Sequence, residues 1–251
     1  MTHPYFAPTS PRVFAHRGLV GAGDDHAPNT FAAFAAAHAA GVDYIESDCH
    51  LTADGVAVLF HDDTLASITG DPRRVDEVTA REMEHQLAGL GGLVTLEQAF
   101  DAFPRMRFNI DVKAEAAAVP AGRNIAEHAE RTLVTSFSDK RRRTALRAAL
   151  PARPATSAGK ETMVRLAAAA ALRAEGWAKR VLDGVDALQI PVRQGPVPVL
   201  TPRLLEYAHR AGAEVHVWTI NDPAEMRRLV TMGADGIVTD RADVALDALA
   251  E

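Results

Sequence analysis

Cysteine is nearly absent from this sequence, because Cys49 is the only one among 251 residues. A single thiol cannot form a disulfide within the chain, so nothing in the cysteine content requires an oxidising compartment. Aromatic residues are also few, at 6% of the chain, whereas alanine-rich runs recur along it. This balance favours small-residue helices packed on a sheet over an aromatic-rich β-sandwich.

An excess of basic residues is missing as well, since 27 Lys and Arg face 33 Asp and Glu for a formal net charge of −6. That balance argues against a nucleic-acid partner or an anionic membrane surface. No run of about 18 apolar residues is present, so we expect no stable membrane insertion. Segment 1–11 lacks the apolar stretch of a secretory signal. We expect a cytoplasmic protein with a small-molecule partner, and these features do not indicate its oligomeric state.

The sequence does contain enough apolar material for a core, with 47% hydrophobic and 24% charged residues. Its dominant pattern is an alternation of short apolar runs with amphipathic, capped segments. Strands are expected over 12–15, 44–48, 56–60, 107–113, 133–137, 154–157, 187–190, 214–220 and 236–239. Helices are expected over 29–40, 95–103, 139–150, 163–182, 202–211 and 223–232, and a further helix closes the chain.

Alternating strands and helices predict a parallel sheet, and about eight such units in 251 residues predict a single-domain α/β fold, the (β/α)8 TIM barrel. Residues 1–251 form this barrel in our interpretation, with 62–94 as a short insertion after the second strand region. An open doubly wound sheet is the alternative. It is disfavoured because no G-x-G-x-x-G motif follows the first strand.

Chemically versatile side chains gather where the predicted strands end, which is the end at which barrels place their active sites. These side chains are His16 and Arg17, Glu46 and Asp48, His61, and Asp111 and Lys113. Residues two apart on a strand point to the same face, so each acidic or mixed pair projects together into the barrel mouth. Three carboxylates are thus expected to converge there.

Converging carboxylates need a positive charge between them, and an all-oxygen ligand set suits Mg²⁺ or Ca²⁺ better than zinc. The two histidines titrate near neutral pH, as an acid–base pair requires. Arg17 and Lys113 add charge suited to a phosphoryl group. Together these groups indicate phosphodiester cleavage. The simpler alternatives are structural histidines, solvated carboxylates and a plain ion pair between Asp111 and Lys113.

Ordered motifs over nearly the whole chain resemble the glycerophosphodiester phosphodiesterases. In chain order these motifs are Ala15-His16-Arg17-Gly18, Asn29-Thr30, Glu46-Ser47-Asp48, Leu51-Thr52-Ala53-Asp54-Gly55, His61-Asp62 with Thr64-Leu65, Asn109-Ile110-Asp111-Val112-Lys113, Val217-Trp218-Thr219-Ile220-Asn221 and Gly236-Ile237-Val238-Thr239-Asp240. The resemblance implies a (β/α)8 barrel that uses a divalent cation to hydrolyse glycerophosphodiesters, such as glycerophosphocholine or glycerophosphoethanolamine, to an alcohol and glycerol 3-phosphate.

The resemblance also implies roles by position. These are His16 and His61 as the acid–base pair, Glu46, Asp48 and Asp111 as metal ligands, and Arg17 and Lys113 as phosphate contacts. Trp218, at the mouth end of its strand, is a candidate wall for the glycerol carbons, with core packing as the alternative. Two departures stand out. Asp111 replaces the family's usual Glu, and the loop over 27–30 lacks the family's Glu, for which His26 or Asp25 could substitute.

The residues are also compatible with two other functions. A sphingomyelinase D-like lyase uses similar histidines and acids, but those proteins are secreted and carry disulfides, unlike a chain with one cysteine. A non-catalytic barrel that binds a phosphodiester is the other alternative. Outside the site, we expect His216 and Gln189 to line the lumen as satisfied polar groups. The basic run 140–143 is expected on a solvated helix face, and Cys49 as a small buried residue.

Overall fold

Eight parallel strands form the centre of the fold, in the order β6-β5-β4-β2-β1-β11-β10-β7. Their bounds are β1 (Arg12–His16), β2 (Tyr44–Leu51), β4 (Arg107–Val112), β5 (Thr132–Thr135), β6 (Ala155–Thr156), β7 (Ala187–Pro191), β10 (Glu214–Trp218) and β11 (Gly236–Thr239). A parallel bridge between Ser157 and Ala187 joins the two end strands. The sheet is therefore a nearly closed barrel, and the predicted fold class is confirmed.

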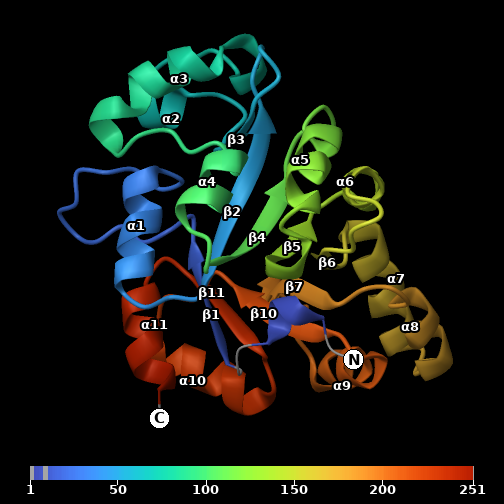
Figure 1. Cartoon of the computed structure of the whole chain (residues 1–251). Coiled ribbons are helices and arrows are strands. Elements are labelled where there is room, and N and C mark those ends of the chain that lie inside the picture. The colour runs from blue at the N-terminus through green and yellow to red at the C-terminus, as the bar shows by residue number, and fades with distance from the viewer. Residues whose placement is uncertain (1–2, 8–10, 251) are drawn as a thin grey trace.

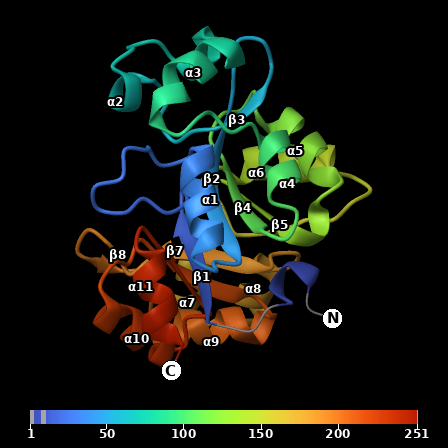
Figure 2. The same cartoon turned by 60° about the vertical axis from the view of Figure 1, so that its left-hand side comes forward.

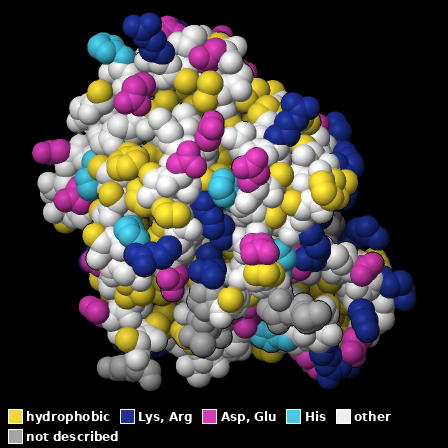
Figure 3. Space-filling model, in the orientation of Figure 1, with side chains coloured by type: hydrophobic (Ala, Val, Ile, Leu, Met, Phe, Trp, Pro, Cys, Tyr) yellow, Lys and Arg dark blue, Asp and Glu magenta, His cyan; other side chains and the backbone are white. Residues whose placement is uncertain are grey.

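This computed structural model describes residues 3–7 and 11–250. The expectation that segment 1–11 carries no signal stretch thus falls partly outside the described residues. Within the described part of the chain, no helix is long and apolar enough to cross a membrane. On the face shown in Figure 3, basic and acidic side chains lie interspersed among hydrophobic ones.

Helices surround the strands (Figure 1). Those of the barrel are α1 (Phe31–Ala39), α4 (Leu96–Ala102), α5 (Ala118–Ala126), α6 (Asp139–Ala148), α7 (Lys160–Ala171), α8 (Glu175–Val181), α9 (Pro202–Ala211), α10 (Pro223–Met232) and α11 (Ala242–Leu249). Their starts follow from local chemistry. Thr30 accepts a hydrogen bond from the backbone N–H of Ala33, and Thr95 and Gln98 form a reciprocal capping box.

The prediction of one long helix over 163–182 was wrong, because this segment folds as parts of two helices. Helix α7 ends at Ala171, Arg173 adopts a left-handed backbone with φ of 55°, and α8 begins at Glu175. Left-handed backbone is costly for a residue with a side chain and interrupts a right-handed helix. No glycine or proline stands at 172–174 to announce the break.

A short hairpin and a small helical segment extend the barrel beyond β2. Strand β3 (Ala57–Leu59) pairs antiparallel with β2, as predicted, with Cys49 opposite Leu59. Segment 62–94 then forms α2 (Ala66–Thr69), α3 (Ala80–Leu87) and 3-10 turns at Val75–Glu77 and Ala88–Leu90. Figures 1 and 2 both show this segment past the end of β2. Its own apolar cluster packs it on the hairpin, with Val58, Phe60, Leu65, Val75, Val78, Met83, Leu87 and Leu93 as members.

The opposite end of the barrel is held by a buried polar network. An Arg12 nitrogen lies 2.7 Å from a Glu214 carboxylate oxygen, and a second donates to the hydroxyl of Tyr44. His216 Nε2 lies 3.0 Å from Glu214, and His216 Nδ1 lies 3.5 Å from the amide of Gln189. His216 and Gln189 are thus partnered polar groups inside the barrel, as expected. This end is structural, which leaves the carboxyl ends of the strands for chemistry.

The basic run 140–143 is only partly a solvated face, so that prediction needs correction. Lys140 and Arg143 are exposed, but Arg142 is buried and lies 2.8 Å from the carboxylate of Asp139. Arg141 Nε donates a hydrogen bond to Ser136 Oγ at 2.8 Å. A run of like charges on a helix spans more than one face, because successive residues turn by about 100°.

Candidate active site

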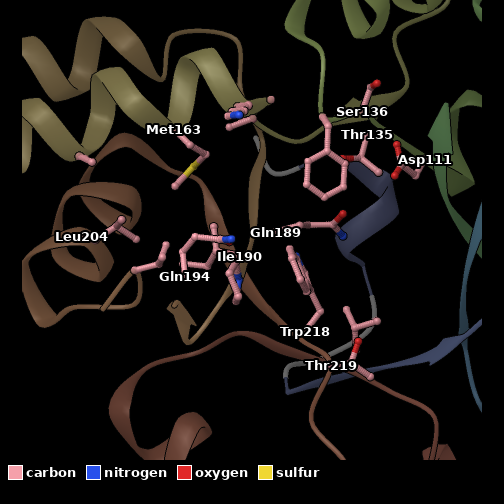
Figure 4. Close-up of a pocket in the computed structure, with 18 of the residues that line it drawn as sticks. Asp111, Thr135, Ser136, Met163, Gln189, Ile190, Gln194, Leu204, Trp218 and Thr219 are labelled. Carbon is pink, nitrogen blue, oxygen red and sulfur yellow. The ribbon is translucent and has the colours of Figure 1, made fainter. Parts of the chain in front are cut away.

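One cavity of about 1060 Å³ opens at the carboxyl ends of the strands, and Figure 4 shows it in close-up. Every residue that the sequence placed in the site lines this cavity: His16, Arg17, Glu46, Asp48, His61, Asp111, Lys113 and Trp218. The strands bring them together because β1, β2 and β4 are neighbours, with His16 opposite Glu46 and Asp48 opposite Asp111 in register. The roles assigned to these residues remain predictions at this point.

Two of the three carboxylates contact one ammonium group. Lys113 Nζ lies 2.9 Å from Asp48 Oδ1 and 2.7 Å from Asp111 Oδ2, and all three side chains are largely buried. Arg17 approaches from the other side, with Nε 3.3 Å from Asp48 Oδ2. Asp48 is therefore neutralised by two cations. Oε2 of Glu46 and Oδ1 of Asp111 are buried and have no hydrogen-bond partner.

The pKa shifts follow this distribution of charge. Burial, with the charges of Asp48 and Asp111 added to it, raises the pKa of Glu46 well above its usual value. Burial would also raise the pKa of Asp48, but the charge and hydrogen bond of Lys113 outweigh it and the pKa is lowered. The pKa of Asp111 is raised by burial despite the contact with Lys113. The more distant charges of Lys113 and Arg17 offset this rise in the pKa of Glu46 only in part.

His16 is oriented by a residue from the far end of the chain. Its Nδ1 lies 2.6 Å from Asp240 Oδ1, and Asn221 Nδ2 donates to Asp240 Oδ2 at 2.8 Å. Hydrogen bonds from His16 and then Asn221 hold the pKa of Asp240 below its usual value, so this carboxylate stays charged. His16 Nε2 points toward the buried carboxylates and lies 3.8 Å from Glu46 Oε2.

His61 has the same kind of partner. Its Nδ1 lies 2.5 Å from Asp62 Oδ1, and the hydroxyl of Ser67 donates to the other oxygen of that carboxylate. Ser67 and then His61 keep the pKa of Asp62 low through these hydrogen bonds. In both histidines the bond at Nδ1 fixes the orientation of the ring and leaves Nε2 available for proton transfer.

Sequence reasoning missed these carboxylates as site residues, although Asp62, Asn221 and Asp240 stand in the motifs that carry the family resemblance. It also missed Asn29, whose Nδ2 donates to Asp48 Oδ2 at 3.1 Å and whose Oδ1 accepts from Ser47. A polar residue directly after each of the last two predicted strands, 214–220 and 236–239, was the available signal.

The loop before Asn29 does not supply a substitute for the family's missing Glu. His26 Nε2 bonds the backbone carbonyl of Leu19 at 3.0 Å, and Asp25 is exposed. Neither side chain lines the cavity, so the expectation that one of them takes the place of that Glu is wrong for this conformation.

Glu46, Asp48 and Asp111 are the predicted ligands of a cation. Among residues 3–7 and 11–250, no three His, Cys, Asp or Glu side chains are arranged around one point as metal ligands are. Lys113 stands between two of the predicted ligands. The donor chemistry nevertheless fits, because two buried carboxylate oxygens without partners are the ligands that a hard cation prefers.

Residues 16–244 match the model of the glycerophosphoryl diester phosphodiesterase family. The chain belongs to this family. This phosphodiesterase is 41% identical to the probable glycerophosphodiester phosphodiesterase 2 of Mycobacterium tuberculosis, over 94% of the present chain and 90% of that protein. It is 24% identical to lysophospholipase D GDPD1 of Rattus norvegicus, over 91% of the present chain and 83% of that protein.

Solved structures share the fold of this phosphodiesterase. A putative glycerophosphoryl diester phosphodiesterase from Silicibacter pomeroyi superposes with a TM-score of 0.75 at 23% identity, covering 99% of the present chain and 97% of that one. An Oleispira antarctica phosphodiesterase, solved in complex with the product sn-glycerol-3-phosphate, gives a TM-score of 0.73 at 22% identity, covering 96% and 97%. At such identities the likeness establishes the barrel rather than the details of the site.

Proposed function

We propose that this phosphodiesterase hydrolyses glycerophosphodiesters, such as glycerophosphocholine and glycerophosphoethanolamine, to the free alcohol and glycerol 3-phosphate, with His16 and His61 as its acid–base pair. The observation that carries this proposal is the pairing of each histidine's Nδ1 with a charged carboxylate, Asp240 or Asp62. Two imidazoles oriented in this way on one cavity are suited to take one proton and give another.

The mechanism follows from the groups around the cavity. One histidine accepts the proton of the nucleophile, which is water or a glycerol hydroxyl of the substrate. The other donates a proton to the departing alkoxide, which is a poor leaving group without it. Arg17 and Lys113 place positive charge beside the phosphoryl oxygens, where negative charge grows in the transition state. Trp218 offers a flat surface to the glycerol carbons.

The proposal includes Mg²⁺ or Ca²⁺ held by Glu46, Asp48 and Asp111. Its support is the pair of buried, unpartnered carboxylate oxygens on Glu46 and Asp111. When bound, such a cation supplies Lewis-acid stabilisation of the phosphoryl charge. Asp111 is one methylene shorter than the family's usual Glu, so its carboxylate lies closer to β4, where Lys113 already contacts it.

Product analysis tests the proposal. The protein is incubated with glycerophosphocholine or glycerophosphoethanolamine and Mg²⁺, Ca²⁺ or a chelator, and glycerol 3-phosphate is measured. We expect its release with a cation and its loss with the chelator. A cyclic phosphate without free glycerol 3-phosphate would assign the lyase chemistry instead. Tight binding without turnover would assign a binding function. The cytoplasmic location stays a prediction.

A further inference from the structure

Asn109 is a polar side chain in the cavity to which the proposed mechanism gives no role. It lies on β4, two residues before Asp111, and is only 1% exposed although it lines the cavity. Neither its Nδ2 nor its Oδ1 has a hydrogen-bond partner among the described residues. A buried amide with both an unpaired donor and an unpaired acceptor is costly and rare in folded proteins. Such a group needs a functional explanation.

Unpaired polar atoms of this kind are concentrated at the carboxylate end of the cavity. Eight buried side-chain nitrogen and oxygen atoms lack a hydrogen-bond partner among the described residues, and five of them belong to residues that line the cavity. These five are Arg17 Nε, Glu46 Oε2, Asp111 Oδ1 and the two amide atoms of Asn109. The explanation for Asn109 is therefore to be found among the proposed cation ligands.

The strand register places Asn109 beside Glu46. Strands β2 and β4 pair in parallel with Glu46 opposite Asn109, and β1 and β2 pair with His16 opposite Glu46. All three side chains line the cavity, so Glu46 stands between His16 and Asn109 on the inner face of the barrel. On the His16 side, the 3.8 Å between Nε2 and Glu46 Oε2 exceeds hydrogen-bond length. The nearest amide donor in register with Glu46 is that of Asn109.

Asp48, another proposed ligand, already has an amide partner of this kind. Asn29 Nδ2 donates to Asp48 Oδ2 at 3.1 Å, and Asn29 Oδ1 accepts from Ser47. Carboxylates that ligate a metal are generally hydrogen-bonded to a further residue, which orients them. Glu46 Oε2 has no such bond within the described part of the chain. Asn109 carries the same functional group as Asn29, at the adjacent strand position.

We propose that Asn109 is a positioning residue for Glu46, and that its Nδ2 donates a hydrogen bond to the ionised carboxylate when Glu46 ligates the proposed cation. The inference rests on the proposed function, because it concerns the same site. A neutral amide is suited to this task. A lysine there would compete with the cation, as Lys113 can at Asp48 and Asp111, and an apolar side chain would offer no donor.

The proposal predicts opposite effects on stability and on cation affinity. Asn109→Leu replaces the amide by an apolar side chain of similar shape and removes two buried, unpaired polar atoms. In the presence of a chelator, its Tm is expected to exceed that of the wild type by about 2 to 4 °C. Its affinity for Mg²⁺ or Ca²⁺ is expected to be about 10- to 100-fold weaker. Loss of a merely structural residue would lower Tm and leave the cation affinity unchanged.

Isothermal titration calorimetry of the full-length protein with Mg²⁺ and with Ca²⁺ measures the affinity, and differential scanning fluorimetry with a chelator measures Tm. Gln86→Leu is the matched control. Gln86 lies on α3, outside the cavity, and its Oε1 is also buried without a partner. The control makes the same exchange of an amide for an apolar side chain and is expected to leave the cation affinity unchanged.

A second pair of variants tests the donor itself. Asn109→Thr and Asn109→Val are nearly equal in shape and differ in one hydroxyl group, and both side chains suit a strand. The Thr variant is expected to bind the cation about tenfold more tightly than the Val variant, because only its hydroxyl can donate to Glu46. This comparison decides the question if Asn109→Leu does not fold.

Wild-type cation affinity in Asn109→Leu overturns the inference, and so does an equal loss of affinity in Asn109→Leu and Gln86→Leu. These outcomes leave the proposed function intact, because the wild type still binds a cation and releases glycerol 3-phosphate from glycerophosphocholine. A wild type that binds neither cation would remove the proposed cation and this inference with it. Glycerophosphocholine turnover by the same sample then shows whether the proposed hydrolysis also fails.

Discussion

Asp240 Oδ1 lies 2.6 Å from His16 Nδ1, and the other oxygen of Asp240 accepts from Asn221, so residues from the ends of β1, β10 and β11 form one chain of hydrogen bonds. The carboxylate holds the imidazole so that Nε2 points toward Glu46, 3.8 Å from its Oε2. A similar carboxylate, Asp62, holds His61. The two imidazoles are thus oriented by carboxylates that lie far apart in the sequence.

Asp240→Asn removes the negative charge beside His16 and keeps its size. We expect kcat to fall by about 10- to 100-fold, because the proton-transfer step loses its oriented imidazole, while KM changes little. ¹⁵N NMR of the His16 ring is expected to show an altered tautomer balance. Asp243→Asn is the control, since Asp243 forms an ion pair with the exposed Arg241 and does not line the cavity. Equal kinetics for the two variants would contradict a positioning role.

Glu46→Gln separates the cost of a buried charge from the gain of a bound cation. Because burial raises the pKa of Glu46, this carboxyl group destabilises the folded protein at neutral pH without metal, and the variant is expected to have the higher Tm there. Excess Mg²⁺ or Ca²⁺ is expected to raise the wild-type Tm by about 5 °C at roughly 100 times Kd, and the variant's Tm far less.

Differential scanning fluorimetry with and without a chelator measures both effects. Glu84→Gln, an exposed carboxylate on α3, serves as control and is expected to behave as wild type. An equal cation-induced rise in the wild type and Glu46→Gln would remove Glu46 from the ligand set.

Asp139 is expected to make stability fall in acid. Burial would raise its pKa, but hydrogen bonds from Thr162 and Arg142 outweigh burial and lower it to about 2. A lowered carboxyl pKa stabilises the fold above the unfolded-state value near 4, and this contribution is lost as pH falls from about 4 to about 2. Asp139→Asn should therefore lower the free energy of unfolding by about 2 kcal/mol at pH 7.

Urea unfolding at pH 7, 4 and 3 measures that difference directly. The gap between wild type and Asp139→Asn is expected to narrow at the lower pH values. A gap that stays constant would mean that the carboxylate charge of Asp139 does not contribute in the way described.

Gly122 allows α5 and α6 to touch. A Cβ there would lie 2.8 Å from the Cβ of Ala148 and closer still to the carbonyl of Ala145. Gly122→Ala is expected to destabilise the protein by about 1 to 3 kcal/mol through overpacking. Gly176→Ala in α8 meets only the end of Arg180, 3.8 Å away, and is expected to stabilise by about 0.5 to 1 kcal/mol. Thermal unfolding of both variants checks this. A change in Tm of the same sign in both variants would refute it.

The sequence predicted elements best where local chemistry marks both ends. The helices over 202–211 and 223–232 were predicted to the residue, because each has a proline in its first turn and a glycine just after its end. The break between α7 and α8 carries no such signal, because a left-handed arginine interrupts an alanine-rich pattern. At this break the backbone N–H of Ala174 donates to the carbonyl of Ala169, a bond that ends α7 without a glycine.

The site was also predictable only in part. The residues that the sequence analysis assigned to it lie on strands or shortly after them, so strand ends and alternation placed them in one cavity. The partners that orient them lie on loops, and Asp240 is 224 positions from His16. Residues so far apart in the sequence come into contact only when the barrel closes. The burial of Arg142 was missed for the same reason, since its partner Thr156 comes next to it only in the folded barrel.

The most direct test of the central claim, that His16 and His61 act as an acid–base pair, varies the leaving group. Wild type, His16→Ala and His61→Ala are assayed with glycerophosphocholine and with glycerophospho-p-nitrophenol. Both variants are expected to lose about 100-fold or more on glycerophosphocholine. The variant that lacks the acid should recover most of its activity on the nitrophenyl ester, whose leaving group needs no proton, and the other should not. Full activity of both variants on glycerophosphocholine would contradict the account.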